Sequence, residues 1–332
     1  MRVGLFDVGG QKHPNLPLMK ISAYHKAKGD DVTWANHLDK YDVVYVSRVF
    51  SDTYCPDDQY GFNSDCVIYG GTGYAIETIN GIERYIPEKD KNLPDEIEHT
   101  YPDYELYGDL TKNTAFGFLT RGCPNNCPFC IVSAKEGRIS HKVANLSEFW
   151  RGQKEIKLFD ANLLACKDRM DLLTQLSDSG ALVDFTQGLD ARLINQEVAK
   201  QLARINIKMV HFAFDLIKNE KAIINGLKLY KETNNVTSRN AIVYILTGFN
   251  TTFAEDMYRV RVVQSLGYSP DIRIYNKPSA PKILKDLQRW SNNRILYRSC
   301  DFWDYTARGK TMRETYAKEY EEAEINSKCC LV

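Results

Sequence analysis

Short apolar runs alternate with stretches of helical spacing between residues 114 and 276, and this alternation restricts the fold more than any other feature. Helices are expected near 146–152, 168–178, 195–204, 218–232 and 253–266. The expected strands are Ala115–Thr120, Ile156–Phe159, Leu182–Thr186, Met209–Phe214, Ala241–Leu246 and Ile272–Tyr275. Because parallel strands need such crossovers, this order predicts a partial (β/α)6 barrel of the TIM type, shorter than the eight-unit barrel.

The first 80 residues show a shorter version of the same pattern. Expected strands are Arg2–Asp7, Val32–Ala35, Tyr41–Ser47 and Cys66–Tyr69, with a helix around Leu18–Tyr24. This order predicts a Rossmann-like open parallel sheet over residues 1–80. Residues 81–113 show no period and are expected to be a linker, 114–279 to be the barrel, and 280–332 to be a charged helical extension. The predicted fold class is therefore α/β.

Three of the nine cysteines lie within eight residues, in the run Cys123-Pro-Asn-Asn-Cys127-Pro-Phe-Cys130. Three thiolates on a short loop hold three irons of a four-iron cluster and leave the fourth iron without a protein ligand. A structural zinc site would need a fourth ligand, and the nearest candidate, His141, has the wrong spacing for a compact zinc knuckle. Gly122 allows a sharp turn after the first barrel strand, at the end where barrels carry their active sites.

This CxxxCxΦC pattern, with Phe129 as the aromatic residue Φ, resembles the hallmark of the radical S-adenosylmethionine enzymes, and the resemblance covers roughly residues 114–276. It implies a [4Fe-4S] cluster on Cys123, Cys127 and Cys130, with S-adenosylmethionine on the open iron. In that family the reduced cluster cleaves S-adenosylmethionine to methionine and a 5′-deoxyadenosyl radical, which abstracts hydrogen from the substrate. The resemblance also implies an external electron donor of the flavodoxin or ferredoxin type. The protein would supply position and exclude water.

Polar residues after the second and third barrel strands match the family's cofactor-binding positions in part. Asp160 or Asn162 stands where the family often has Gly-Gly-Glu for the cofactor's amino group, but the glycines are absent. Gln187, Asp190 and Arg192 follow the third strand, where ribose hydroxyls and the cofactor carboxylate would be held. Arg192 offers a bidentate fork for that carboxylate. The alternative is a local ion pair between Asp190 and Arg192.

Later strands add further candidates. Gly248 follows the fifth strand and Tyr275 ends the sixth, and the resemblance implies that both lie near adenine. Cys300 follows the strand-like run Ile295–Arg298 and is a candidate catalytic hydrogen-atom donor, with a buried structural thiol as the alternative. His211 is expected to face inward from the fourth strand, either lining the substrate pocket or as a core histidine.

The first domain is similar to that of the radical enzymes with an N-terminal cobalamin-binding domain. The ligand signature Asp-x-His-x-x-Gly is missing, because His13 lies six residues after Asp7 and precedes Pro14. Histidine-ligated cobalamin is therefore not expected. Cobalamin bound without that ligand is the less favoured alternative, because the subgroup includes members of that kind as well as members whose related domain binds none. The Gly70-Gly71-Thr72-Gly73 run is similar to a nucleotide-binding turn, or is simply a tight strand–helix turn. Methylthiotransferases carry three more cysteines in this domain; here only Cys55 and Cys66 occur, so one cluster is expected.

Charge and composition bear on partners and compartment. The chain carries 43 basic and 43 acidic side chains, but residues 1–110 hold 10 and 19 of them, a balance of −9, and residues 111–332 hold +9. The second part suits an anionic ligand, although this surplus is far from the stripe of a duplex binder, so nucleic acid is not favoured. The chain has no apolar run of 18 residues and no secretory signal, so we expect a cytoplasmic protein without a membrane partner.

The reaction remains open at this level. Methyl transfer, rearrangement, and nucleoside or peptide modification all fit the motif, and the substrate is unknown. Two other classes of function compete with a radical enzyme: an iron–sulfur electron-transfer module without radical chemistry, and a zinc-stabilised nucleic-acid binder. The expected open barrel argues against the first, and the missing fourth ligand argues against the second.

Overall fold

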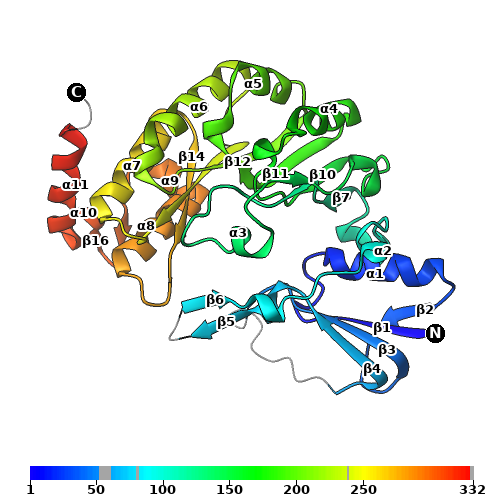
Figure 1. Ribbon diagram of the computed structural model, residues 1–332. Helices are drawn as coiled ribbons and strands as arrows, with labels where there is room; N and C mark the ends of the chain where they lie inside the picture. The colour runs from blue at the N-terminus through cyan, green and yellow to red at the C-terminus, as the bar shows by residue number, and fades with distance from the viewer. Residues whose placement is uncertain (52–60, 80–81, 238, 330–332) are drawn as a thin grey trace. The chain divides into compact units, whose positions relative to one another are not determined.

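The computed structural model describes residues 1–51, 61–79, 82–237 and 239–329 (Figure 1). The chain divides into two compact units. One comprises Met1–Asn125 and Ile131–Phe159, and the other comprises Asn126–Cys130 and Asp160–Val332. The boundaries expected at residues 80, 113 and 279 stay predictions.

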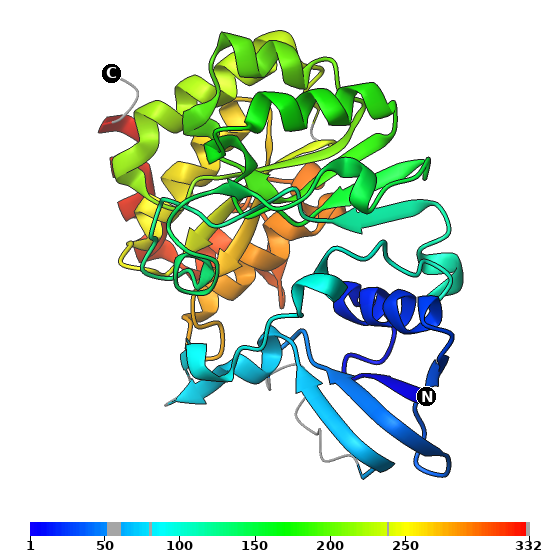
Figure 2. The same cartoon turned by 45° about the vertical axis from the view of Figure 1, so that its right-hand side comes forward.

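The N-terminal sheet is parallel with strand order β2-β1-β3-β4, which confirms the predicted Rossmann-like arrangement. Its strands are β1 (Arg2–Asp7), β2 (Asp31–Trp34), β3 (Lys40–Ser47) and β4 (Asn63–Gly70). Helix α1 (Leu16–Ala27) begins at Asn15, whose side chain accepts a hydrogen bond from the Leu18 amide. Leu18 and Ile21 of this helix pack against Val3 and Leu5 of β1. Figure 2 shows the blue helix α1 lying along one face of this sheet. Burial of these side chains fixes the helix on the sheet.

The stretch expected to be an irregular linker contains several short elements. They are β6 (Ile82–Tyr85), α2 (Asp95–Glu98) and the 3₁₀ turns η2 (Pro87–Lys89) and η3 (Gly108–Leu110). Strand β6 pairs antiparallel with β5 (Ile76–Ile79), which follows the 3₁₀ turn η1 (Thr72–Ala75) and lies before this stretch. Ile97 of α2 joins the apolar cluster around Val3 and Leu5. Elements of three or four residues are too short to show a period, and α2 buries only the one apolar side chain of Ile97, which is why the pattern did not predict them.

The second sheet has six parallel strands in the order β14-β13-β12-β11-β10-β7. They are β7 (Thr114–Gly117), β10 (Glu155–Leu158), β11 (Leu182–Leu189), β12 (Ile207–Ala213), β13 (Ala241–Thr247) and β14 (Ser269–Ile274). Each of the six predicted strands is present. The predicted α/β class with a partial (β/α)6 sheet is confirmed.

Four crossover helices lie along one face of this sheet (Figure 1). They are α4 (Arg169–Ser179), α5 (Gln196–Leu202), α6 (Glu220–Thr233) and α7 (Phe253–Ser265), each close to its predicted range. The helix expected over 146–152 is wrong, because that segment forms only the 3₁₀ turn η4 (Leu146–Glu148). Phe149 leaves the turn, and its ring approaches Gly117 of β7 so closely that a Cβ there would lie 2.5 Å from it.

Short elements connect these strands and helices. They are β8 (Thr120–Arg121), α3 (Val132–Lys135), β9 (His141–Lys142), η5 (Leu163–Ala165), η6 (Ala191–Leu193) and η7 (Ile217–Asn219). Among the described helices, none is both long enough and apolar enough to cross a membrane.

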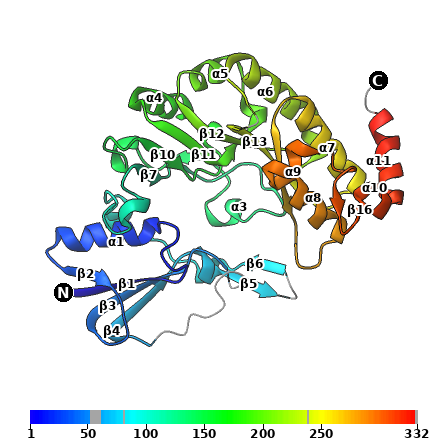
Figure 3. The same ribbon diagram turned by 180° about the vertical axis from the view of Figure 1, so that it is seen from behind.

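The C-terminal segment is mainly helical, as predicted. It contains α8 (Lys282–Asn292), α9 (Arg294–Ser299), β15 (Thr306–Ala307), β16 (Lys310–Thr311), α10 (Met312–Thr315) and α11 (Ala317–Cys329). The strand-like interpretation of Ile295–Arg298 is wrong, because the Asn293 side chain accepts hydrogen bonds from the Ile295 and Leu296 amides and starts a helix there. Figure 3 shows α11 beside α7, where Trp303 contacts both Phe253 and Tyr320.

The outer strand β14 is protected by side chains of α8. The Ile272 amide donates to Asn292 Oδ1 at 2.8 Å, and the Ile272 carbonyl accepts from Gln288 Nε2 at 2.9 Å. Side-chain amides thus satisfy backbone groups that an edge strand otherwise leaves open to pairing with another chain.

Candidate active site

The cysteine loop is closed at its base by the two-stranded ladder of β8 and β9. Gly122 has φ +88°, and a Cβ at this position would lie 2.2 Å from the Ile139 carbonyl oxygen. The Gly122 amide donates to Glu136 Oε2 at 3.0 Å, and the Cys123 amide donates to the Gly137 carbonyl at 3.1 Å. Gly122 is therefore required both for the turn and for the close approach of the two ends of the loop.

The three thiols lie on a segment that solvent reaches. Cys123 and Cys127 are half-buried, Cys130 is exposed, and the Cys130 amide donates to the Cys127 carbonyl in a tight turn. Among the described residues, no group of three or more His, Cys, Asp or Glu side chains is arranged as a metal site. Three accessible thiolates on one loop nevertheless make up the donor set that a four-iron cluster with one open iron requires. Their role as ligands stays a prediction.

The aromatic residue of the cysteine motif contacts a residue at the end of one barrel strand, and that residue contacts another at the end of the next strand. The Phe129 ring lies edge-on to Phe249 with ring centroids 5.2 Å apart, and Phe249 lies edge-on to Tyr275 at 4.9 Å. Phe249 follows β13 and Tyr275 follows β14. The structure thus brings together two predicted residues, Phe129 and Tyr275, through a third that the sequence analysis did not select. Its position directly after Gly248 is the signal that would have identified it.

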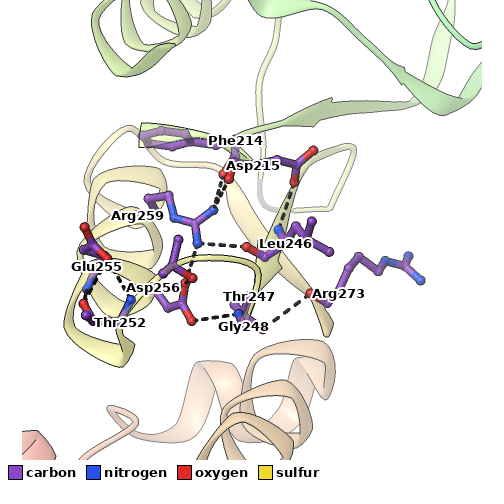
Figure 4. A network of polar contacts seen from close by, with 11 residues as sticks. Phe214, Asp215, Leu246, Thr247, Gly248, Thr252, Glu255, Asp256, Arg259 and Arg273 are labelled. Carbon is purple, nitrogen blue, oxygen red and sulfur yellow. Dashed lines mark hydrogen bonds and ion pairs between the residues drawn. The ribbon is translucent and has the colours of Figure 1, made fainter. Parts of the chain in front are cut away.

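A buried arginine holds the ends of β12 and β13 in place (Figure 4). Arg259 of α7 is fully buried; its Nη1 donates to the Phe214 and Asp215 carbonyls at 2.8 and 2.9 Å, and its Nη2 donates to the Leu246 carbonyl at 2.8 Å. Nη2 also pairs with Asp256 Oδ1. One guanidinium therefore ties two neighbouring strand ends to the following helix.

Asp256 extends this network to the glycine turn after β13. It accepts hydrogen bonds from the Gly248 amide at 3.3 Å and from the Thr251 hydroxyl at 2.8 Å. Burial raises the pKa of the Asp256 carboxyl, and the Arg259 charge opposes that rise. Gly248 has φ +73°, which favours glycine. The network thereby sets the direction in which the chain presents Phe249.

Residues after β10 and β11 form a second polar group. Asp160 and Asn162 are buried, and Asn162 Nδ2 donates to Asp190 Oδ2 at 3.3 Å. Arg192 Nε and Nη2 donate to the two Asp190 oxygens at 2.8 and 2.6 Å. The local ion pair that the sequence left open as an alternative is therefore present, and Arg192 would have to exchange this partner to bind a cofactor carboxylate.

Gln187 lies on an irregular strand end. The pairing of β11 with β12 shifts register between Phe185 and Leu189, and Gly188 has φ +103°. Such a bulge redirects the side chains beside it. Gln187 is exposed there, so its amide is available to a ligand at the strand end. Its role in cofactor binding stays a prediction.

The face of the second sheet opposite the helices carries a polar stack. His211 lies parallel to Tyr244 with ring centroids 5.0 Å apart, and the Arg273 guanidinium lies 4.7 Å from the Tyr244 centroid. His211 Nδ1 donates to the Phe185 carbonyl at 2.9 Å, so the ring is anchored and its Nε2 faces away from that bond. Burial raises the pKa of the nearby Asp271 carboxyl, with Arg273 and His211 opposing the rise. This polar face fits a polar ligand better than the apolar filling of an ordinary barrel core.

The cysteines outside the motif lie apart from these groups. Cys300 ends α9, with its sulfur 3.8 Å from the Leu296 carbonyl, and its own carbonyl accepts from Trp290 Nε1 at 3.0 Å. That setting suits the structural alternative, and its catalytic role stays a prediction. Cys166 is fully buried. Cys55 and Cys330 lie outside the described residues.

The glycine run of the first unit packs against the chain after β3. A Cβ at Gly71 would lie 2.3 Å from the Arg48 carbonyl oxygen, and one at Gly73 would lie 2.2 Å from the Phe50 carbonyl oxygen. The Gly73 amide donates to the Arg48 carbonyl at 2.9 Å. Close backbone packing thus accounts for these glycines, as the tight-turn alternative proposed.

Asp7, at the carboxyl end of β1, is held within the first unit. Its carboxylate accepts from the Tyr107 hydroxyl at 2.7 Å, from the Gly9 amide at 3.1 Å and from Asn15 Nδ2 at 3.4 Å. Burial and the Asp7 charge raise the pKa of the Tyr107 hydroxyl. His13 is exposed, and its ring contacts Phe50. Asp7 is thus occupied by neighbours other than His13.

Comparison with known proteins gives partial matches. No protein-family model matches the sequence. A segment of 129 residues is 23% identical to the tRNA-2-methylthio-N(6)-dimethylallyladenosine synthase of Verminephrobacter eiseniae, covering 35% of this chain and 28% of that protein. A segment of 81 residues is 35% identical to the CDK5RAP1-like protein of Oryza sativa subsp. japonica, covering 20% of this chain and 14% of that protein. The matches thus span less than a third of each relative.

One solved structure resembles most of the chain. It is the radical S-adenosylmethionine methyltransferase TsrM from Kitasatospora setae, described with cobalamin and a [4Fe-4S] cluster bound, at a TM-score of 0.55 and 12% identity. The match covers 82% of this chain and 75% of that one. At 12% identity, this likeness is one of fold. Because 82% of the chain is more than the two thirds made up by residues 114–332, the fold likeness extends into the residues before 114.

Replacing Arg259 tests whether the strand ends depend on it. Arg259→Met leaves Asp256 buried without its ion-pair partner and three carbonyls without their donor, so we expect a loss of about 3–5 kcal/mol in the free energy of unfolding. Arg261→Met, two residues further along α7, removes the partly exposed pair with Asp301 and should cost only about 0–1 kcal/mol. Urea unfolding followed by circular dichroism measures both. Equal losses in the two variants would contradict the role assigned to Arg259.

Proposed function

We propose that this chain is an enzyme that cleaves S-adenosylmethionine on a [4Fe-4S] cluster held by Cys123, Cys127 and Cys130. The observation that carries the proposal is the contact of Phe129, inside the cysteine motif, with Phe249 and, through it, with Tyr275. Those residues follow the fifth and sixth strands of the sheet, where the cofactor's adenine is expected. The match to the tRNA-modifying relative and the TsrM fold supports the same class of chemistry. Neither match supports an electron-transfer module or a zinc-stabilised binder.

When bound, the cluster and S-adenosylmethionine would supply the chemistry of this class: one electron would break the cofactor's C5′–S bond, giving methionine and a 5′-deoxyadenosyl radical able to take a hydrogen atom from a C–H bond of the substrate. Cys123, Cys127 and Cys130 would hold the cluster, and an external donor of the flavodoxin or ferredoxin type would supply the electron. The chain's own part is to hold the three thiolates on one loop and to position the cofactor beside the aromatic residues.

Several side chains are proposed to orient the cofactor. Phe129, Phe249 and Tyr275 offer ring edges and faces for the adenine. Asn162 and Asp190 lie within one hydrogen-bonded group for the amino acid or ribose part. Arg192 is the one guanidinium in that group, and it would bind the cofactor carboxylate after leaving Asp190.

The cluster assignment predicts a specific loss in a triple variant. Cys123→Ala, Cys127→Ala and Cys130→Ala together should abolish iron binding and the broad visible absorption of thiolate-bound iron after anaerobic reconstitution. Cys66→Ser, which changes an exposed cysteine of the first unit, should keep about four irons per chain. Retention of the parent's iron content in the triple variant would disprove the assignment.

The role of Arg192 predicts weaker cofactor binding. Arg192→Ala should raise the dissociation constant of S-adenosylmethionine about tenfold or more, because a charged hydrogen bond contributes about 1.5–3 kcal/mol. Equilibrium dialysis with the reconstituted protein measures the constant. Lys200→Ala removes an exposed cation from the nearby helix α5 and should leave it unchanged. If Arg192→Ala binds as tightly as the parent, Arg192 serves only its ion pair with Asp190.

For the first unit we propose a domain that uses no histidine-ligated cobalamin. His13 is exposed and Asp7 accepts its hydrogen bond from Tyr107, so no hydrogen bond from His13 to the Asp7 carboxylate orients this imidazole for a metal. TsrM is described with cobalamin bound. Whether the first unit of this chain binds cobalamin, and through which ligand, is therefore the property to measure.

Spectra after reconstitution with hydroxocobalamin test this proposal. We expect either no bound corrinoid or a bound corrinoid whose electron paramagnetic resonance lacks axial nitrogen coupling. His13→Ala should leave that result unchanged. A nitrogen coupling in the parent that disappears in His13→Ala would overturn the proposal.

A further inference from the structure

The basic charge of the second half of the chain is concentrated around α8. Residues 276–300 contain one acidic side chain, Asp286, and six basic ones: Lys277, Lys282, Lys285, Arg289, Arg294 and Arg298. This segment therefore supplies +5 of the +9 carried by residues 111–332. More than half of the positive net charge of residues 111–332 therefore lies in one short segment. Charges gathered in this way give a stronger local positive potential than the same charges spread evenly over the surface.

An open hollow of about 640 Å³ lies against this segment. Its lining is polar throughout and contains no carboxylate; the residues are Lys277, Lys285, Gln288, Arg289, Asn292 and Asn293. The hollow follows the outer strand β14, because Gln288 and Asn292 hold the backbone of Ile272.

The cations of the hollow are not neutralised by neighbouring acids. Lys285 Nζ donates to the Pro278 carbonyl at 3.2 Å. No hydrogen bond or ion pair among the described residues engages the side chains of Lys277 or Arg289. Asp286, the acid of this segment, accepts from the Tyr316 hydroxyl at 2.6 Å and does not line the hollow. The hollow thus presents uncompensated positive charge.

Helix α8 presents these cations as a row on a rigid support. Lys282, Lys285 and Arg289 are spaced three and four residues apart, which places them on one helix face over about 10 Å. The opposite face is anchored by buried side chains, among them Leu287 and Trp290. A row of charges on a fixed helix suits a ligand with several linked anionic groups better than a single small anion.

The row begins beside the candidate cofactor site. Lys277 follows Tyr275 by two residues, so their Cα atoms are at most about 7.6 Å apart. Tyr275 in turn contacts Phe249 and, through it, the cysteine loop. A polymer bound along α8 therefore starts at the strand end where the reacting group of the substrate would be presented.

We propose that the α8 hollow binds the phosphate backbone of an RNA substrate. Linked phosphates match a row of uncompensated cations, and the polar lining offers no apolar side chain for insertion into a lipid surface. The name of the first relative, a tRNA-modifying synthase, is consistent with this class of substrate. The inference rests on the proposed function, because it assigns the substrate of that same site.

Binding of a fluorescein-labelled single-stranded RNA of about 12 nucleotides to the cluster-loaded full chain tests the proposal, with anisotropy recorded over a series of salt concentrations. The variant Lys277→Gln, Lys285→Gln and Arg289→Gln should weaken binding about tenfold or more at low salt. It should also make the slope of log K against log[salt] shallower by about 2, since each lost phosphate contact contributes about 0.7.

The matched control has the same change in charge on exposed lysines of α5 and α6. Lys200→Gln, Lys221→Gln and Lys228→Gln should keep the parent's affinity within about twofold and its salt slope. Iron content and thermal unfolding of both variants show that each is folded and loaded. Equal affinity and slope in the α8 variant and the parent would overturn the proposal.

Two competing ligands complete the test. Inorganic phosphate should displace the RNA no more than chloride at equal ionic strength; stronger displacement would indicate a single-phosphate site and overturn the proposal. Vesicles of phosphatidylcholine and phosphatidylglycerol that bind through the same three cations while RNA does not would also overturn it. Formation of 5′-deoxyadenosine by the parent is measured separately, so a failure of radical chemistry is distinguishable from a failure of RNA binding.

Discussion

The arrangement of the candidate site depends on one buried guanidinium. Arg259 binds the backbone carbonyls of two adjacent strand ends and pairs with Asp256, which in turn binds the amide of Gly248. A charge without water must be surrounded by acceptors in fixed positions, so these strand ends cannot shift independently of α7. The same constraint directs Phe249 toward Phe129 and Tyr275. Arg259, which is fully buried and is not itself proposed to touch the cofactor, thus sets the geometry of the contact between Phe249 and Phe129 on which the functional proposal rests.

The second sheet uses its two faces differently. Val243, Ile245 and Ile272 are buried on the face covered by helices, whereas the other face carries the stack of His211, Tyr244 and Arg273. Burial of the first face supplies the hydrophobic stabilisation, and this leaves the second free to be polar. The polar face and the Asn162–Asp190–Arg192 group are the parts of the unit that suit a charged cofactor and a polar substrate.

The comparisons bear on the fold more than on the reaction. The relatives match short segments, while TsrM matches most of the chain at 12% identity. A likeness at that identity is one of fold, and a fold does not by itself fix a substrate. The cations of α8 lie on a helix surface, where side chains can differ without a change of fold.

The sequence alone predicted the strands, most crossover helices, the cysteine loop and the class of fold. Hydrophobic periodicity and cysteine spacing are properties of residues that are close together in the chain, so they can be recognised without the structure. The pattern failed over 146–152 and 295–298, where a capping side chain or a packing contact overrides propensity. Only the tertiary structure showed that Phe249 meets Phe129, that Asp190 occupies Arg192, and that basic residues spread along 276–300 line one hollow. In each case the side chains meet because the chain folds back at strand ends or around helix turns. The distance between two side chains in the fold cannot be calculated from the number of residues that separates them in the sequence.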